Sequence, residues 1–210
     1  MPVAKGLRAI WGGAAILTAL AFTAGGAFGT KSPLAAGLWD SPVPVHFDSA
    51  SQVTRIAERI APDLCFSLHL PQEWRSKAEG AGISLEAVSF SARLEISLRS
   101  AQELRDMPQP DLASRDAAVL QRDYEHLLGR PAQSVSLDRS PYGATRWSAT
   151  WIDANLPSAS RSLTVETFIL PLSSEWILEL SLTHVEMPEV HDALIRRILS
   201  GLKIMTRKAC

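Results

Sequence analysis

The sequence predicts an α+β protein: an antiparallel sheet of about six to seven strands with helices packed mainly on one face. Several segments between residues 64 and 182 alternate apolar and polar residues with a period of two, which is typical of strands. Short turns join these segments, and strands joined in this way pair antiparallel. Elsewhere the apolar residues recur with a helical period, and helices that interrupt such a sheet cover its apolar face.

The expected elements follow from these two periods. The expected strands cover residues 64–70, 84–90, 93–99, 134–138, 146–151, 163–169 and 176–182. Three helices are expected: a short one that Asp48 or Ser49 caps and Pro62 ends, one over 111–128, and one from Pro188 through Leu202.

The first 29 residues are arranged like a secretory signal peptide. Lys5 and Arg8 precede an uncharged stretch, and the small-x-small sequence at 27–29 provides a cleavage site. The alternative is an uncleaved membrane anchor, since about 20 apolar residues span a bilayer. The glycines and alanines of this stretch make it only weakly apolar, which favours cleavage. Either way, we expect the chain to be exported from the bacterial cytoplasm and to act in the periplasm.

The rest of the chain has the size and charge of one ordinary domain. Residues 30–47 are rich in proline, glycine and serine and are interpreted as a linker, followed by a single domain over 48–210. The chain has 21 basic and 22 acidic residues. This near-neutral mixture argues against a nucleic-acid partner and gives no reason to expect a strongly anionic ligand.

Cys65 and Cys210 are the two cysteines of the chain. In an oxidising periplasm such a pair is a candidate disulfide, which would tie an early strand to the C-terminus. The alternative is a buried thiol at Cys65 and a free thiol at Cys210. The sequence does not decide between them, because a disulfide requires a short Cα separation.

Two parts of the chain resemble the Mog1/PsbP/DcrB-like superfamily. Residues 66–74, FSLHLPQEW, read as a strand that runs into a Pro-x-x-Trp turn at Pro71 and Trp74, similar to the first core strand of that fold. Residues 168–180 resemble its last hairpin, and residues 190–202 resemble its terminal helix.

The resemblance spans residues 64–204 and implies a non-enzymatic family of small adaptors, chaperones and assembly factors. The chain departs from the bacterial lipoprotein members, because no cysteine follows the signal segment to accept lipid. No cation-binding or partner-binding residue of a particular member is matched. We therefore expect a periplasmic accessory or binding protein that assists the assembly or stability of an envelope or redox complex. Membrane contact is expected only through an uncleaved N-terminal segment.

Catalytic and metal-binding motifs are lacking in the sequence. The five histidines form no close pair of the kind that strong metal sites show. Cys65 lies within an expected strand rather than on an exposed elbow, and neither a Gly-x-Ser-x-Gly motif nor a phosphate-binding loop follows the signal segment. No catalytic residue, cofactor or metal is therefore assigned. Two alternatives remain: a periplasmic hydrolase with a cleft near His69, or a carrier of a small molecule or ion.

Candidate partner-binding residues come from the linker and from the polar side of the expected sheet. Trp39 lies in the linker, where no core is expected, and tryptophan is enriched in binding hot spots. The sheet candidates share polar positions of the alternating strands, and they are His69, Arg93, Arg99, Arg146 and Glu166. A face of this composition is either an ordinary solvated surface or a platform for a partner protein, since arginine is favoured at interfaces.

Overall fold

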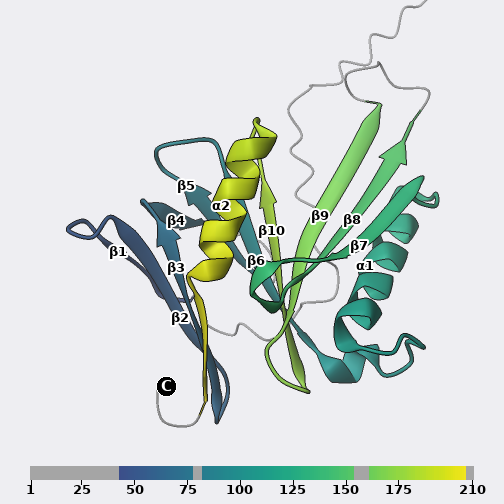
Figure 1. Cartoon of the computed structure of the whole chain (residues 1–210), viewed down its shortest axis with the longest axis horizontal. Helices are drawn as coiled ribbons and strands as arrows, with labels where there is room; N and C mark the ends of the chain where they lie inside the picture. Colours follow the sequence, from purple (N-terminus) through teal and green to yellow (C-terminus); the bar gives the residue numbers. More distant parts are fainter. Residues whose placement is uncertain (1–42, 78–81, 154–160, 207–210) are drawn as a thin grey trace, which may run out of the picture. The chain divides into compact units, whose positions relative to one another are not determined.

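The computed structural model describes residues 43–77, 82–153 and 161–206, all of them within the compact unit Lys31–Cys210. This part of the chain forms two antiparallel sheets with two α-helices (Figure 1). The prediction of an α+β fold with an antiparallel sheet is therefore confirmed. No helix of the described residues combines the length and hydropathy that crossing a membrane requires.

The smaller sheet has four strands in the order β1-β2-β3-β11, and each neighbouring pair is antiparallel. Its strands are β1 (Val45–Asp48), β2 (Val53–Ala61), β3 (Leu64–Pro71) and β11 (Leu202–Thr206). Only β3 was expected from the sequence, and β1 occupies the end of the range assigned to the linker.

The larger sheet has seven strands in the order β4-β5-β6-β10-β9-β8-β7, again antiparallel throughout. Its strands are β4 (Trp74–Lys77), β5 (Ile83–Ala87), β6 (Arg93–Ser100), β7 (Ser134–Arg139), β8 (Thr145–Ile152), β9 (Ser162–Pro171) and β10 (Trp176–Thr183). All of these except β4 were expected, including the hairpin of β5 with β6.

The helix α1 (Leu112–Leu128) begins and ends where its sequence signals lie. The side chain of Asp111 caps it by accepting a hydrogen bond from the backbone N–H of Ser114 at 2.9 Å. Gly129 ends it in the left-handed conformation with φ of 65°, which glycine adopts without strain. Two short 3-10 helices, η1 (Ala101–Leu104) and η2 (Pro141–Gly143), lie in the connections.

The helices α1 and α2 (Pro188–Ser200) pack on opposite faces of the seven-stranded sheet, rather than mainly on one. Phe168 and Leu170 of β9 belong to the core that contains α2 and the four-stranded sheet. Ile169, between them, belongs to the core that contains α1. Figure 1 shows α2 beside β3 and α1 beside β8. At these positions β9 is therefore apolar on both sides, as strands covered on both faces are.

The helix expected after Asp48 is wrong, because this segment forms β2. Thr54 and Ile56 are buried while Arg55 between them is exposed, so the side chains alternate with the period of a strand. Their β-branched side chains also favour a strand over a helix. Asp48 closes the turn from β1 to β2 instead, accepting a hydrogen bond from the backbone N–H of Ala50 at 3.0 Å.

The last expected helix was drawn too long, because α2 ends at Ser200 and the chain continues as β11. Gly201 makes this change of direction possible. A Cβ atom at Gly201 would lie 2.3 Å from the carbonyl oxygen of His69, so only glycine allows the backbone to approach β3 so closely. The backbone N–H of His69 donates to the Gly201 carbonyl at 3.1 Å, which joins the end of α2 to the small sheet.

The Pro-x-x-Trp segment has a structural role at the junction of the two sheets. The indole N–H of Trp74 donates to the Pro71 carbonyl at 2.8 Å, and the Trp74 ring is buried in the large core. The Thr54 hydroxyl donates to the Gln72 carbonyl at 2.7 Å and accepts from the Trp74 backbone N–H at 3.0 Å. The motif thus fixes the turn that carries the chain from β3 into β4.

Candidate functional site

The sheet residues proposed as one polar face lie in three places. The register sets Arg99 opposite Ile177, so the Arg99 side chain faces the core on which α1 packs. Arg93 lies on the same side of β6. Arg146 is opposite Phe168 and therefore faces the other way, together with Glu166. His69 belongs to the smaller sheet. The expectation of a shared face is wrong, because alternation orders residues within one strand, whereas the register decides which strands share a face.

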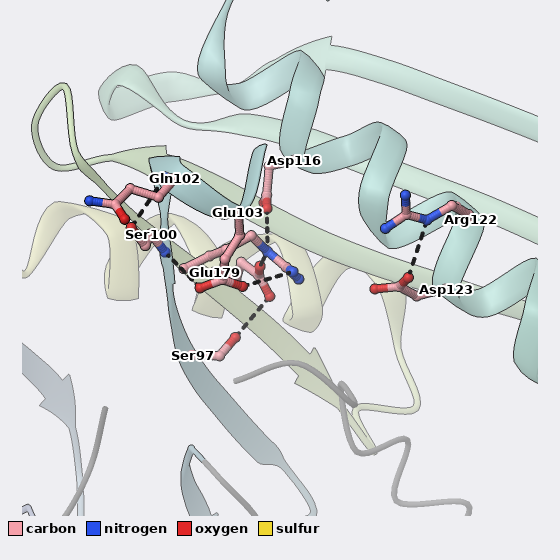
Figure 2. A network of polar contacts seen from close by, with 9 residues as sticks. Ser97, Ser100, Gln102, Glu103, Asp116, Arg122, Asp123 and Glu179 are labelled. Atoms are coloured by element: carbon pink, nitrogen blue, oxygen red, sulfur yellow. Dashed lines mark hydrogen bonds and ion pairs between the residues drawn. The ribbon is translucent and has the colours of Figure 1, made fainter. Parts of the chain in front are cut away.

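Arg99 lies at the centre of a buried ionic cluster, whose acids come from α1, β10 and η1 (Figure 2). Its Nε donates a hydrogen bond to Oε1 of Glu179 at 2.8 Å. The same atom lies 2.6 Å from Oδ1 of Asp116, within ion-pair distance but without hydrogen-bond geometry. Ser97 donates to the second oxygen of Glu179 at 2.8 Å, and Glu103 lies 3.9 Å from Arg99 Nη1.

Two buried carboxylates thus share one guanidinium, and the side chain of Asp116 has no solvent exposure. Burial and the charge of Glu179 raise the pKa of Asp116 well above its usual range. Burial opposes the charge of Arg99, but Glu179 and Asp116 outweigh it and hold the pKa of Arg99 above its ordinary value. The folded protein therefore holds the proton of Asp116 more tightly than the unfolded chain does.

This cluster fixes α1 on the sheet and does not form a catalytic centre. A carboxyl group with a raised pKa is a candidate general acid only where a substrate can reach it. Asp116 is completely buried, and Arg99 and Glu179 are each only 4% exposed. We conclude that Arg99, proposed from the sequence as a partner-surface residue, has an internal structural role.

Arg93 is also buried, and it has an ion-pair partner on the neighbouring strand. Its Nη2 donates to Oε1 of Glu86 on β5 at 2.6 Å, and Lys77 on β4 donates to the same oxygen at 3.2 Å. These two hydrogen bonds lower the pKa of Glu86, the one from Arg93 contributing most. Arg93 thus links the outer strands of the sheet, and its guanidinium offers little surface to a partner.

Arg146 and Glu166, two of the candidates predicted separately, are in direct contact with each other. The Arg146 Nε donates to Oε2 of Glu166 at 2.6 Å, and its Nη2 contacts the same oxygen. His191 of α2 completes the group, with its Nε2 3.7 Å from Oε1 of Glu166. The other ring nitrogen of His191 lies 3.5 Å from Asp192. Within the described ranges no hydroxyl or thiol is hydrogen-bonded to His191, so the group supplies no activated nucleophile.

The sequence did not connect His191 with Glu166. The two residues are 25 positions apart, and the hairpin of β9 with β10 lies between them. Their contact depends on how α2 packs against the sheet, for which the sequence holds no local signal. Arg146 is the most exposed member, and only its guanidinium is well placed to meet a partner.

His69 is half-buried on the outer side of β3, and its charged neighbours are both basic. Burial lowers the pKa of His69 most, and the charges of Lys203 and Arg55 lower it further. A hydrolase centred on His69 would need a carboxylate beside the imidazole. The structure places Glu166 beside His191 instead, so no observation favours the hydrolase alternative. In the described part of the chain, no group of three or more His, Cys, Asp or Glu side chains is placed to hold a metal ion.

Trp39 and Cys210 lie outside the described residues, so the proposed roles of both stay predictions. Cys65 is buried on β3, opposite Met205 of β11. Met205, the partner of Cys65, is therefore only five residues before Cys210 in the sequence.

The edge strand β7 is a surface feature that the sequence analysis missed. All six of its residues are exposed, including Val135 at 44% and Leu137 at 43%. It pairs regularly with β8 on one side, and it is the last strand of the sheet on the other. The opposite edge, β4, is shorter, begins with the buried Trp74, and carries Arg75 and Lys77.

Comparison with known proteins gives similarity to solved structures but no sequence match. No family model matches the chain, and no curated protein sequence does. The fold is similar to the solution structure of the cyanobacterial PsbP protein (CyanoP) from Synechocystis sp. PCC 6803, with a TM-score of 0.44 and 8% sequence identity. The match covers 80% of this chain and 96% of that chain. No residue role or partner is transferred from it.

Proposed function

We propose that this chain is an exported, non-enzymatic accessory protein that binds a protein partner through β7 and assists the assembly or stability of an envelope or redox complex. The observation that carries this proposal is the outer edge of β7, which pairs with no strand of the described residues. A strand at the end of a sheet presents backbone N–H and C=O groups that another extended chain can pair with.

The residues of β7 make this edge suitable for strand addition. Natural edge strands are commonly blocked by lysine, proline, a bulge or short length. β7 has the sequence SVSLDR over six residues, with its charges confined to Asp138 and Arg139 at one end. Val135 and Leu137 lie on the same side of the strand and are partly exposed. An added strand would cover them with its own apolar side chains, since residues opposite each other in a sheet pack together.

Export is supported by the charge pattern of residues 1–29, and intact-mass analysis of the protein recovered from its bacterium tests it. We expect a chain that begins at Thr30 and lacks the two hydrogens lost when Cys65 and Cys210 form a disulfide. The approach of β11 to Cys65 supports this bond. A chain that retains residues 1–29 would indicate the membrane anchor instead. A mass equal to that of the fully reduced chain, with both thiols free, would contradict the disulfide.

The β7 proposal is tested by affinity capture of the tagged chain from the envelope of its bacterium, with and without the substitutions Val135→Lys and Leu137→Lys. Lysine at an edge position hinders strand addition and leaves the fold intact where the side chain is already exposed. We expect the wild type to recover a defined envelope protein and the double variant to lose it.

The matched control is Val88→Lys, because Val88 is 47% exposed and lies in the turn between β5 and β6, away from β7. This variant should retain the partner, and all variants should have the melting temperature of the wild type. Equal recovery with the β7 double variant would contradict docking at this edge. A self-associating chain that the double variant converts to a monomer would show that a second copy, rather than another protein, occupies β7.

A further inference from the structure

The outer face of the four-stranded sheet concentrates basic side chains, although the whole chain is nearly neutral. The inner face of this sheet is buried in the large core around Phe66. On the outer face, His46 of β1, Arg55 of β2, His69 of β3 and Lys203 of β11 project in the opposite direction. We call these four residues the basic face. His46, Arg55 and Lys203 are exposed, and His69 is half-buried.

The strand register places the four side chains in adjacent positions. His46 is directly opposite Arg55, and Arg55 is directly opposite His69, so these three form one row across three strands. Lys203 is opposite Ser67, which makes it a diagonal neighbour of His69. Side chains directly opposite each other have Cβ atoms about 5 Å apart, and diagonal neighbours are about 7–8 Å apart.

The charge of this face is poorly neutralised within the described residues. Asp48 is the only carboxylate that the four described strands place on it. Asp48 is already engaged in its own turn, where its carboxylate accepts hydrogen bonds from Ala50 N–H and the Ser51 hydroxyl. It lies 3.8 Å from Arg55 Nη2, and the Arg55 side chain is 56% exposed. An exposed contact at this distance contributes little.

We propose that the basic face binds a carboxylate-rich segment of a partner protein. Arginine matches a carboxylate with two parallel hydrogen bonds, and Arg55 stands in the middle of the row. The neighbouring positions Ala57 and Ser67 are small, so an extended segment can lie flat across the strands. None of the large apolar side chains exposed in the described residues lies on this face. A surface that enters lipid needs such side chains, so the composition favours a protein segment over a membrane.

The test measures binding of a fluorescein-labelled polyglutamate peptide to the full chain by fluorescence anisotropy at low salt. The variant Arg55→Gln with Lys203→Gln should bind it about tenfold more weakly, as expected for the loss of two partly exposed ion pairs. The control is Arg122→Gln with Arg196→Gln, which removes the same net charge from exposed positions of α1 and α2. The control should bind like the wild type, and both variants should retain the wild-type melting temperature.

Three results would overturn the proposal. Equal weakening in both double variants would mean that only the net charge matters, and absence of measurable binding to the wild type would remove the site. Binding to phosphatidylglycerol vesicles that exceeds peptide binding and depends on Arg55 and Lys203 would assign the face to lipid. The Val135→Lys, Leu137→Lys variant should bind the peptide normally, so this test fails or succeeds independently of the proposed role of β7.

Discussion

The two faces of the seven-stranded sheet are stabilised by different means. On the face toward α2 and the small sheet, the core is a large apolar cluster, and the ion pair of Arg146 with Glu166 on this face is partly exposed. On the face toward α1, a smaller apolar core around Trp147 and Trp151 adjoins the ionic cluster of Arg99, Asp116 and Glu179. The difference shows that the large core depends mainly on buried apolar area, whereas the smaller one also depends on buried charge pairing.

The ionic cluster determines where α1 lies. Apolar contacts tolerate small shifts of a helix along a sheet, because one apolar neighbour replaces another. An unpaired buried charge, in contrast, costs several kcal/mol. Since Glu179 belongs to the sheet and Asp116 to the helix, α1 is stable only in the position that keeps Asp116 beside Arg99. The stability of the α1 face should therefore depend more strongly on charge and pH than that of the α2 face.

The largest effect is expected from Arg99→Leu. This change leaves Asp116 and Glu179 buried together without a cation, and removing one partner of such a group costs about 3–5 kcal/mol. Denaturant titration at about pH 7 should show this loss in the free energy of unfolding. The loss should become smaller at about pH 4, because Asp116, whose pKa is raised, is then increasingly protonated.

The matched change on the other face is Leu180→Ala, which removes a fully buried side chain of the large core. It should lower the free energy of unfolding by about 2–5 kcal/mol, and by the same amount at both pH values, because no titrating group is involved. A pH-independent loss for Arg99→Leu would show that the guanidinium acts only through packing.

A smaller effect of opposite sign is expected from Asp116→Asn. The raised pKa of Asp116 means that the folded protein holds a proton which the unfolded chain releases. The stability from this proton is complete below the unfolded pKa of about 3.9 and is lost as the pH rises through the folded value. Asparagine keeps the shape of the neutral acid and removes one of two carboxyl groups that share Arg99.

The Asp116→Asn variant should therefore be more stable than the wild type at about pH 8, by about 1–2 kcal/mol, and the advantage should shrink as the pH falls. Thermal or denaturant unfolding across this pH range measures it. A variant that is less stable at high pH would show that Asp116 contributes as a paired carboxylate, and that the pKa assigned to it has the wrong direction.

The elements with strong local signals were predictable, and those that depend on distant partners were not. The α1 helix carries its own cap at Asp111 and its own stop at Gly129, so its bounds could be predicted. The β2 segment has apolar spacing compatible with both periods, and its pairing with β1 and β3 decides the outcome. The β11 strand is short and follows a helix directly, so nothing local separates it from that helix.

The same distinction holds for the candidate site residues. Alternation correctly placed Arg99 on the polar side of its strand, but it did not show that a helix covers that side. The sequence did hold a signal for Asp116, the member of the ionic cluster that comes from α1. Asp116 lies three residues after Ala113 and four before Leu120. It therefore falls within the apolar stripe of α1, where a carboxyl group requires a buried partner. The face of Arg146 could not be predicted, since it depends on the register of β8 with β9.

The smallest effect is expected from Asp111→Ala, and it separates the two acids of α1. The hydrogen bond from the Ser114 backbone N–H is the main cause that lowers the pKa of Asp111, so its stabilising contribution is present above the unfolded pKa and is lost as the pH falls. Removing this cap should cost about 1 kcal/mol at about pH 7 and almost nothing at about pH 2.5. Asp116→Asn should show the opposite trend, with its gain confined to high pH. If both variants changed stability in the same direction with pH, the two carboxyl groups would share one environment, and the contrast between the exposed end of α1 and its buried side would be wrong.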